Sequence, residues 1–307
     1  MSTGFFCIDK PEGMTSHDVV SRLRRILNMK KVGHSGTLDP MATGVLVVGC
    51  GPSTRLLDYV QAGVKEYVAH VVFGIKTSSG DVQGEIVDTC DMNSLTREEL
   101  DVAVSKFIGT ISQIPPMVSA VKIGGKKLYE YEREGIVIER EPRETVIESI
   151  EVEDFVPALE GVAPHARIRV VCHAGTYIRT LAEDIAAALG GYAHLDELRR
   201  TRNGYVSQDQ CVSLERLKEL DDPFSLMITP AQALSHLAFV ELDDMQTLAV
   251  SHGKTLALND VQQKVFDEST SEFVMVSGSV PRELIAIYPQ DTSGEFRSRC
   301  VVFLDDL

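Results

Sequence analysis

The sequence of 307 residues predicts an α+β fold with a large first domain and a small second one. Strand-like and helix-like segments are interspersed along residues 1–235 without a regular strand–helix–strand alternation, which argues against a doubly wound parallel sheet. Short β-branched and aromatic runs separated by turn residues dominate residues 236–307, as in a small all-β domain. The length also exceeds what one hydrophobic core usually supports. We therefore expect domains at residues 1–235 and 236–307.

Two kinds of local signal define the elements of the first domain. Capping residues mark the helices, with Thr15 or Ser16 before the first, Thr96 near the start of the second and glycine after the third. β-Branched runs ended by glycine or proline mark the strands. The predicted strands are residues 5–8, 45–48, 66–75, 85–88 and 166–173, and the predicted helices are residues 17–28, 96–108 and 177–189. Residues 110–150 alternate turn signals with short apolar pieces, so we expect a projecting insertion there.

The composition excludes several classes of protein. No run of about 18 apolar residues and no signal-peptide pattern is present, so we expect a cytoplasmic protein without a membrane span. The six cysteines form no CxxC and match no zinc spacing, which predicts reduced thiols and no metal. GxxxxGK[ST] and GxSxG are absent, and GxGxxG is incomplete because Thr54 replaces its third glycine. We expect no cofactor, with an S-adenosylmethionine site as the weak alternative.

The charge distribution bears on a nucleic-acid partner. The net charge of −15 argues against one at first sight. The acidic residues are concentrated after residue 210, however, and basic residues cluster locally at 22–31, 122–127 and 199–202. Such patches can bind phosphates on an acidic protein, with a strong dependence on salt.

Three residues stand out as candidates for chemistry. Asp39 lies in the glycine-rich segment 33–44, before a proline that disfavours helical backbone at residue 39. The sequence is compatible with two interpretations of Asp39, a turn-capping aspartate and a catalytic carboxylate. With Thr176 as the expected N-cap, Arg179 lies in the first turn of a helix, where a cation opposes the helix dipole by about 0.3–1 kcal/mol. An anionic partner would compensate, and an exposed arginine is the alternative. Tyr67 opens a strand and is either a core residue or a platform for a base.

A series of short blocks carries a more specific pattern. The blocks are Asp9–Ser16 (DKPEGMTS), Gly33–Gly44 (GHSGTLDPMATG), Lys65–Tyr67 (KEY), Ile114–Lys122 (IPPMVSAVK), Gly125–Tyr131 (GKKLYEY), Gly175–Leu181 (GTYIRTL) and Leu198–Thr201 (LRRT). In this order they resemble the TruB family of bacterial tRNA pseudouridine-55 synthases, over residues 5 to about 205. The last 70 or so residues match only loosely.

The resemblance implies a fold and a reaction. The fold is a pseudouridine-synthase catalytic domain with a mixed, mainly antiparallel sheet and flanking helices, followed by a PUA-like domain. The reaction isomerises one uridine of the tRNA T-loop to pseudouridine, without metal, cofactor or ATP. Asp39 is then the essential aspartate, as a nucleophile at C1′ or as a base at C2′. Arg179 would pair with Asp39 and keep its pKa low, and Tyr67 would stack on the target base.

The resemblance also implies how RNA binds. The target base is flipped into the enzyme, and His34 fills its place in the RNA stack. The insertion at about 110–150 clamps the T-stem-loop, and the block at 198–201 lies near the pocket or the RNA. The implied RNA-contacting residues are His34, Lys122, Lys126, Lys127, Leu198, Arg199 and Arg200. Lys10 has a supporting role. We expect a monomer that needs no protein partner; an RNA-binding or tRNA-folding protein without required catalysis is the alternative, and a guide-dependent particle subunit is disfavoured by the lack of basic tails.

Overall fold

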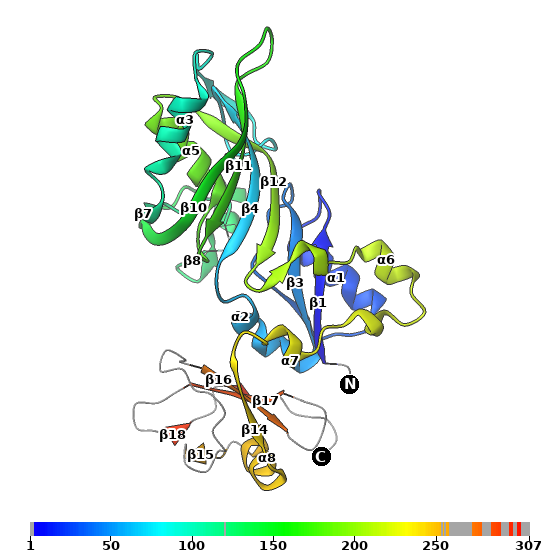
Figure 1. The fold of residues 1–307 in the computed structure, drawn as a ribbon. Coiled ribbons are helices and arrows are strands. Elements are labelled where there is room, and N and C mark those ends of the chain that lie inside the picture. The colour runs from blue at the N-terminus through cyan, green and yellow to red at the C-terminus, as the bar shows by residue number, and fades with distance from the viewer. Residues whose placement is uncertain are drawn as a thin grey trace.

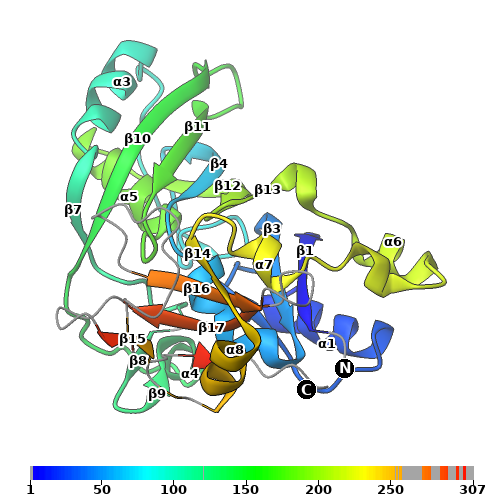
Figure 2. The same ribbon diagram turned by 60° about the horizontal axis from the view of Figure 1, so that its bottom comes forward.

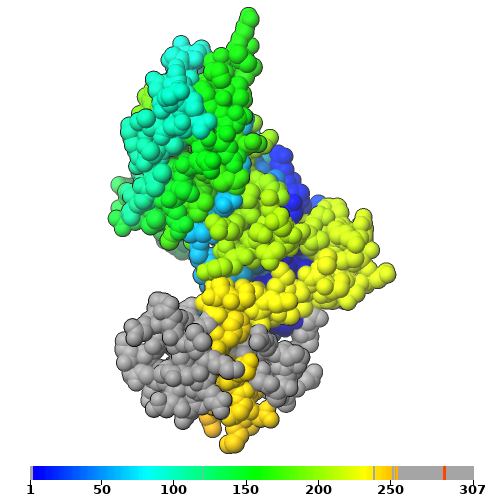
Figure 3. Space-filling model, viewed as in Figure 1, coloured from blue at the N-terminus to red at the C-terminus, as the bar shows by residue number. Residues whose placement is uncertain are grey.

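The computed structural model describes residues 3–119, 121–252, 254, 256–257, 272–277, 284–289, 295–296 and 300–301. Figure 1 shows a long twisted sheet formed by the first part of the chain, with a smaller group of strands below it. The turn between β10 and β11 extends from the body as a finger in the space-filling view (Figure 3).

The main sheet has nine strands and is mixed but mainly antiparallel, which confirms the predicted fold class. Its order is β1–β3–β12–β4–β11–β10–β7, with β2 paired to β3 and β13 paired to β12. β3 and β12 are parallel, and the other neighbours are antiparallel. The bounds are β1 Gly4–Lys10, β2 Val32–Ser35, β3 Thr43–Cys50, β4 Lys65–Phe73, β7 Gly109–Gln113, β10 Arg143–Val156, β11 His165–Cys172, β12 Ala193–Asn203 and β13 Val206–Ser207. A separate hairpin joins β5 (Ile75–Thr77) to β6 (Ile86–Thr89).

Helices cover the two faces of this sheet. The alternation along β1 shows the division: Phe6 and Ile8 pack in the core cluster with residues of α1, α3 and α5, whereas Phe5 and Cys7 pack with residues of α2 and α7. Fully burying such a side chain stabilises the fold by about 1.5–3 kcal/mol. The helices are α1 Ser16–Ile26, α2 Leu57–Val60, α3 Arg97–Ser105, α4 Leu128–Arg133, α5 Ile178–Ala188, α6 Leu214–Glu219, α7 Pro230–Ala233 and α8 Asp244–Ser251.

Capping explains where the first helices begin. Thr15 caps α1 and Thr96 caps α3, each through a reciprocal capping box with the third helical residue. The third helix differs from the prediction, because Tyr177 rather than Thr176 is the N-cap of α5. Thr176 instead places its hydroxyl against Thr145 and His173. Arg179 is therefore the second helical residue, still within the first turn.

Two other predictions need correction. Residues 33–44 were expected to be a loop throughout, but His34 and Ser35 belong to β2, because their backbone pairs with β3. Within the expected insertion, residues 110–113 and 143–150 are part of the main sheet, since β7 pairs with β10. The segment outside the sheet contains the hairpin of β8 (Lys122–Ile123) and β9 (Lys126–Lys127), followed by α4.

The last part of the chain forms its own sheet. β14 (Ala238–Leu242), β16 (Glu272–Ser277), β17 (Leu284–Pro289) and β19 (Cys300–Val301) pair in that order, and β15 (Leu256–Ala257) pairs with β18 (Glu295–Phe296). The predicted all-β domain also contains α8, which lies against this sheet in Figure 2. Asp243 caps α8 through a capping box with Gln246. Ile287 of β17 packs into the same cluster as Phe5 of β1.

Candidate functional site

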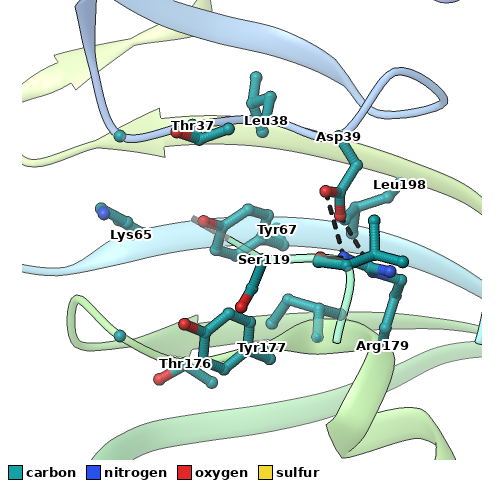
Figure 4. A pocket seen from close by; sticks show the side chains of 14 residues that line it. Thr37, Leu38, Asp39, Lys65, Tyr67, Ser119, Thr176, Tyr177, Arg179 and Leu198 are labelled. Atoms are coloured by element: carbon teal, nitrogen blue, oxygen red, sulfur yellow. Dashed lines mark hydrogen bonds and ion pairs between the residues drawn. The ribbon is translucent and has the colours of Figure 1, made fainter. Parts of the chain in front are cut away.

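A pocket of about 210 Å³ opens over β4, beside the glycine-rich loop between β2 and β3. Figure 4 shows Asp39 and Arg179 facing each other at one end of this pocket. The pocket is lined by Gly36, Thr37, Leu38, Asp39, Lys65, Tyr67, Val118, Ser119, Gly175, Thr176, Tyr177, Ile178, Arg179 and Leu198. Five segments far apart in the sequence thus meet at one place, and they include all three candidate residues for chemistry.

The loop that carries Asp39 is fixed on both sides of the carboxylate. Before it, the Ser16 hydroxyl accepts a hydrogen bond from the Leu38 N–H at 2.9 Å and donates to the Leu38 carbonyl at 3.2 Å. After it, the fully buried Lys10 donates from Nζ to the Pro40 carbonyl at 3.2 Å. These bonds come from α1 and β1, so Asp39 is positioned by regular elements, and the expected supporting role of Lys10 has a structural basis.

Arg179 holds the Asp39 carboxylate with two nitrogens. Nε lies 3.0 Å from Oδ2, and Nη2 lies 3.2 Å from Oδ1. The same guanidinium donates to the carbonyls of Ser79 at 2.9 Å and Val118 at 2.7 Å, and Nη1 lies 3.8 Å from Asp81. The Arg179 side chain is 5% exposed and that of Asp39 is 29% exposed. A bidentate pair of this kind fixes the direction of the carboxylate, which remains open to the pocket.

The protonation of Asp39 differs from the sequence expectation. Burial raises the pKa of the Asp39 carboxyl above its ordinary value, and the nearby Asp81 acts in the same direction. The Arg179 guanidinium lowers that pKa, as expected, but burial is the larger effect, so the net shift is upward. The ion pair therefore opposes a protonation that the buried site would otherwise favour.

Tyr67 lies on the floor of the pocket, with its hydroxyl directed away from Asp39 (Figure 4). It is 7% exposed, and burial raises the pKa of its hydroxyl, so the phenol is protonated at neutral pH. Arg200 lies opposite Tyr67 on the neighbouring strand and acts to lower that pKa. The ring is thus held on rigid strands.

Arg200 does not have the place that was expected of an RNA-contacting residue. Its side chain is fully buried, donating from Nε to the Val45 carbonyl at 2.8 Å and from Nη2 to the Gly36 carbonyl at 3.0 Å. Buried arginine satisfied by backbone carbonyls links the glycine-rich loop to β3. We therefore correct its assignment: Arg200 supports the pocket from beneath and cannot contact RNA in this structure.

The other two residues of that block are accessible to different degrees. Leu198 is almost buried and lines the pocket directly. The Arg199 side chain is 38% exposed, and its Nη1 and Nη2 lie 3.0 and 3.1 Å from the two Asp9 carboxylate oxygens. An RNA phosphate would have to compete with Asp9 for this guanidinium.

His34 and the lysines of the β8–β9 hairpin lie outside the pocket. Burial lowers the pKa of His34, to which Arg200, His17 and Lys127 also contribute, so its imidazole is neutral at neutral pH. Within the described residues its Nδ1 has no hydrogen-bond partner.

Tyrosines accompany two of the hairpin lysines. Lys126 pairs with Glu134 and lies 4.7 Å from the centre of the Tyr131 ring. Lys127 donates to the Tyr129 hydroxyl at 3.3 Å, while Lys122 is exposed. These cations are presented on a short hairpin beside a short helix, outside the pocket that contains Asp39.

The sequence analysis missed three contributors to the pocket. Lys65 lies two residues before Tyr67, and the period of a strand places both on one face, which could have revealed it. Tyr177 and Ser119 project toward each other across the pocket in Figure 4; their sequence signal is that each lies within one of the blocks that resemble the family. Over the described ranges, no three His, Cys, Asp or Glu side chains form a group suited to a metal ion. A search of the same ranges finds no helix long and apolar enough to cross a membrane.

Comparisons with known proteins agree with this geometry. Residues 24–178 match the model of the TruB family pseudouridylate synthase N-terminal domain, and residues 179–234 match that of the tRNA pseudouridylate synthase B C-terminal domain. The fold and the site thus define a pseudouridylate synthase. Within that class, the chain belongs to the TruB family, as the sequence blocks indicated.

Individual relatives support the same assignment. The chain is 44% identical over 265 residues to a tRNA pseudouridine synthase B of Bacillus pumilus, which covers 85% of each protein. It is 46% identical over 244 residues to one of Symbiobacterium thermophilum, covering 80% of each.

Solved structures also match 99% of the chain, among them two from H/ACA particles. One is an H/ACA RNP bound to a substrate RNA containing 2′-deoxyuridine, with a TM-score of 0.73, 25% identity and 86% coverage of that chain. The other is a protein complex of the archaeal box H/ACA sRNP, with a TM-score of 0.72, 25% identity and 87% coverage.

Proposed function

We propose that this protein is a tRNA pseudouridine synthase that isomerises the uridine at position 55, in the T-loop. The observation that supports this most strongly is the Asp39 carboxylate, held by two nitrogens of Arg179 at the end of an otherwise open pocket. The name that these relatives share, tRNA pseudouridine synthase B, supports tRNA as the substrate class.

The reaction breaks one bond, forms another and needs no external reagent. The N1–C1′ bond breaks with its electron pair going to the base, the base turns, and C5 bonds to C1′; the proton leaves C5 and N1 gains one. Asp39 either attacks C1′ or removes the C2′ proton, and both roles require an ionised carboxylate near the sugar. Arg179 opposes protonation of Asp39 and fixes its direction. No metal or cofactor is required for this balance.

The target base must leave the RNA stack to reach Asp39. Unstacking costs a few kcal/mol, which contacts in the pocket have to offset. Tyr67 offers a ring face for stacking. Taking the proton from C5 would require its phenolate form, which the raised pKa of the hydroxyl opposes at neutral pH. Leu198 supplies an apolar wall. We assign to His34, which is neutral and lies outside the pocket, the role of filling the vacated position in the RNA.

The β8–β9 hairpin is proposed to clamp the T-stem-loop. Lys122, Lys126 and Lys127 would neutralise phosphates there, so affinity should fall steeply with salt. Arg199 is a fourth candidate if its pairing with Asp9 opens. The PUA-like second domain is proposed at residues 236–307. Because the chain is acidic after residue 210, we propose that this domain contributes little to RNA affinity.

We further propose that the protein acts alone, as a cytoplasmic monomer. Its curated relatives are named tRNA pseudouridine synthase B, with no particle in the name, whereas the two structural neighbours come from H/ACA particles. The purified chain should therefore convert T-arm RNA without a guide RNA or a second protein. A requirement for either one would refute independent action.

Product mapping tests the proposed function. T-arm RNA is incubated with the purified protein, digested and analysed for pseudouridine, and the modified position is located by carbodiimide labelling and primer extension. We expect conversion at position 55 by the parent and by Asp101→Asn, a surface control on α3, and none by Asp39→Asn. Conversion by Asp39→Asn would refute the catalytic assignment.

The RNA-folding alternative makes a different prediction in the same samples. It is favoured if the parent binds T-arm RNA tightly but forms no pseudouridine at any position. Equal binding by the parent and Asp39→Asn, with product formed only by the parent, favours the enzyme.

A further inference from the structure

Lys65 is a buried lysine in the pocket to which the proposed reaction assigns no role. It is 8% exposed, and it begins β4. Across the residues that the structure describes, no carboxylate forms an ion pair with it, and the charge that influences its pKa most is that of another cation, Arg200. Burial lowers its pKa from 10.5 to about 8. An unpaired buried cation is unfavourable, so its presence in a substrate pocket points to a ligand group that accepts hydrogen bonds.

The order of side chains across the pocket places Lys65 at the end away from Asp39. Lys65 and Tyr67 lie on the same face of β4, and Tyr67 lies between Lys65 and Asp39 in Figure 4. A base that stacks on Tyr67, with its sugar at Asp39, therefore extends toward Lys65.

Uracil has a carbonyl group at the position that this pose directs toward Lys65. The base is joined to its sugar through N1, and the ring atom opposite N1 is C4, which bears O4. We propose that the Lys65 ammonium donates a hydrogen bond to the carbonyl edge of the flipped uracil and so selects a base with an acceptor there. This inference rests on the proposed function, because it uses the position of the sugar at Asp39.

The same contact survives the rearrangement. When the base turns about its N3–C6 axis, C5 takes the place of N1, and C2 with O2 takes the place of C4 with O4. Lys65 therefore faces a carbonyl oxygen before and after the turn. Between the two states, the base carries the electron pair of the broken bond, delocalised over both oxygens, and a cation stabilises that charge.

The chemistry of an ammonium group makes this contact selective for uracil over cytosine. It has three donors and no acceptor, so it suits a carbonyl and opposes the amino group that cytosine carries at C4. The ring of Tyr67 and the apolar side chain of Leu198 cannot make this distinction by shape, because uracil and cytosine have nearly the same outline. A buried polar group left unpaired is what rejects the wrong base.

A double-mutant cycle between enzyme and substrate tests the proposal. Single-turnover rates and RNA affinities are measured for the parent, Lys65→Met and Lys65→Gln, each with T-arm RNA bearing uridine or 4-thiouridine at the target position. Sulfur keeps the ring but accepts hydrogen bonds weakly. Lys106→Met, an exposed lysine on the C-terminal end of α3, is the matched control. Thermal unfolding of each variant is recorded near pH 7.

We expect Lys65→Met to slow uridine conversion about 10- to 100-fold, as for loss of a hydrogen bond to a charged donor, with RNA affinity within about threefold of the parent. The parent should discriminate against 4-thiouridine by a similar factor, and Lys65→Met should lose that discrimination. Lys65→Gln, which retains a donor, should recover part of the rate. Lys65→Met should also raise Tm, because it removes an unpaired buried charge. If Lys65 instead stabilised the fold, the same substitution would lower Tm.

Three outcomes would overturn the proposal. Equal discrimination by parent and Lys65→Met would show that Lys65 does not contact the carbonyl edge. Weaker RNA binding with an unchanged single-turnover rate would assign Lys65 to a phosphate. An unchanged rate and affinity would leave it without a role. Failure of the proposed function is distinguished from all of these, because then the parent itself would not convert uridine.

Discussion

Replacing Arg179 with methionine is expected to reduce the rate about 100- to 200-fold at neutral pH. The change removes both nitrogens from Asp39 while the carboxylate remains in place. Each charge-assisted hydrogen bond contributes about 1.5–3 kcal/mol, so losing the two bonds that orient the reacting carboxylate is expected to raise the activation barrier by about 3 kcal/mol. A barrier higher by about 3 kcal/mol corresponds to that loss of rate.

The same substitution should change the pH dependence in a defined direction. Burial already raises the pKa of Asp39, and Arg179 is the main influence that lowers it. Without Arg179 the pKa rises further, so less of the carboxylate is ionised, and the acid limb of the rate profile moves to higher pH. Raising the pH should recover part of the lost activity.

Single-turnover tritium release from C5-labelled RNA, between pH 5.5 and 9.5, measures both effects. Arg97→Met is the matched control, because Arg97 binds both Asp101 oxygens through Nε, at 2.9 and 3.0 Å, on the surface. We expect it to change the rate less than about threefold, since exposed pairs contribute only about 0–1 kcal/mol. An Arg179→Met rate within tenfold of the parent, or a loss with no movement of the acid limb, would refute the reasoning.

Three further predictions concern the support of the site. Arg200→Met leaves the Gly36 and Val45 carbonyls without their partner, so unfolding in urea should show a loss of about 2–4 kcal/mol, while the RNA affinity of the folded protein stays within threefold. Gly44 has a φ of +97°, and a Cβ there would lie 2.2 Å from the Arg200 carbonyl oxygen, so Gly44→Ala should destabilise the fold by about 2 kcal/mol or more and lower activity by displacing the loop. Burial lowers the pKa of Lys65 from 10.5 to about 8 in the folded state. The folded protein is therefore destabilised by the buried ammonium below about pH 8, and this destabilisation is absent above pH 10.5, where the amine is neutral. In urea unfolding, Lys65→Met should therefore be more stable than the parent at pH 7, by up to about 3 kcal/mol, and this advantage should disappear above pH 10; equal curves for both proteins at every pH would contradict the prediction.

Much of the first domain could be predicted because local and tertiary signals agree there. β1 and β3 are continuous apolar runs, and Thr15 and Thr96 form capping boxes that need no distant partner. β12 (Ala193–Asn203) was missed because its sequence is rich in charge. Its Arg200 can be buried because backbone carbonyls from other parts of the chain accept its hydrogen bonds. Nothing in the local sequence shows that these partners will be present.

In the candidate site, too, local sequence signals predicted some features, whereas others depend on the folded chain. The position of Arg179 in the first turn indicated that an anion should lie nearby, but only the folded chain brings it to Asp39, 140 residues away. The upward shift in the pKa of Asp39 was not predicted, because burial is a property of the assembled pocket. α8 was missed because strand-like runs on both sides of it dominate the local pattern.

The central claim is that Asp39 drives uridine isomerisation in this pocket. Its most direct test is tritium release from T-arm RNA labelled at uridine C5, with purified protein and no other addition. The account predicts one equivalent of tritium released per target uridine by the parent and none by Asp39→Asn, which should still bind the RNA. Release by Asp39→Asn, or no release by a parent that binds the RNA tightly, would contradict it.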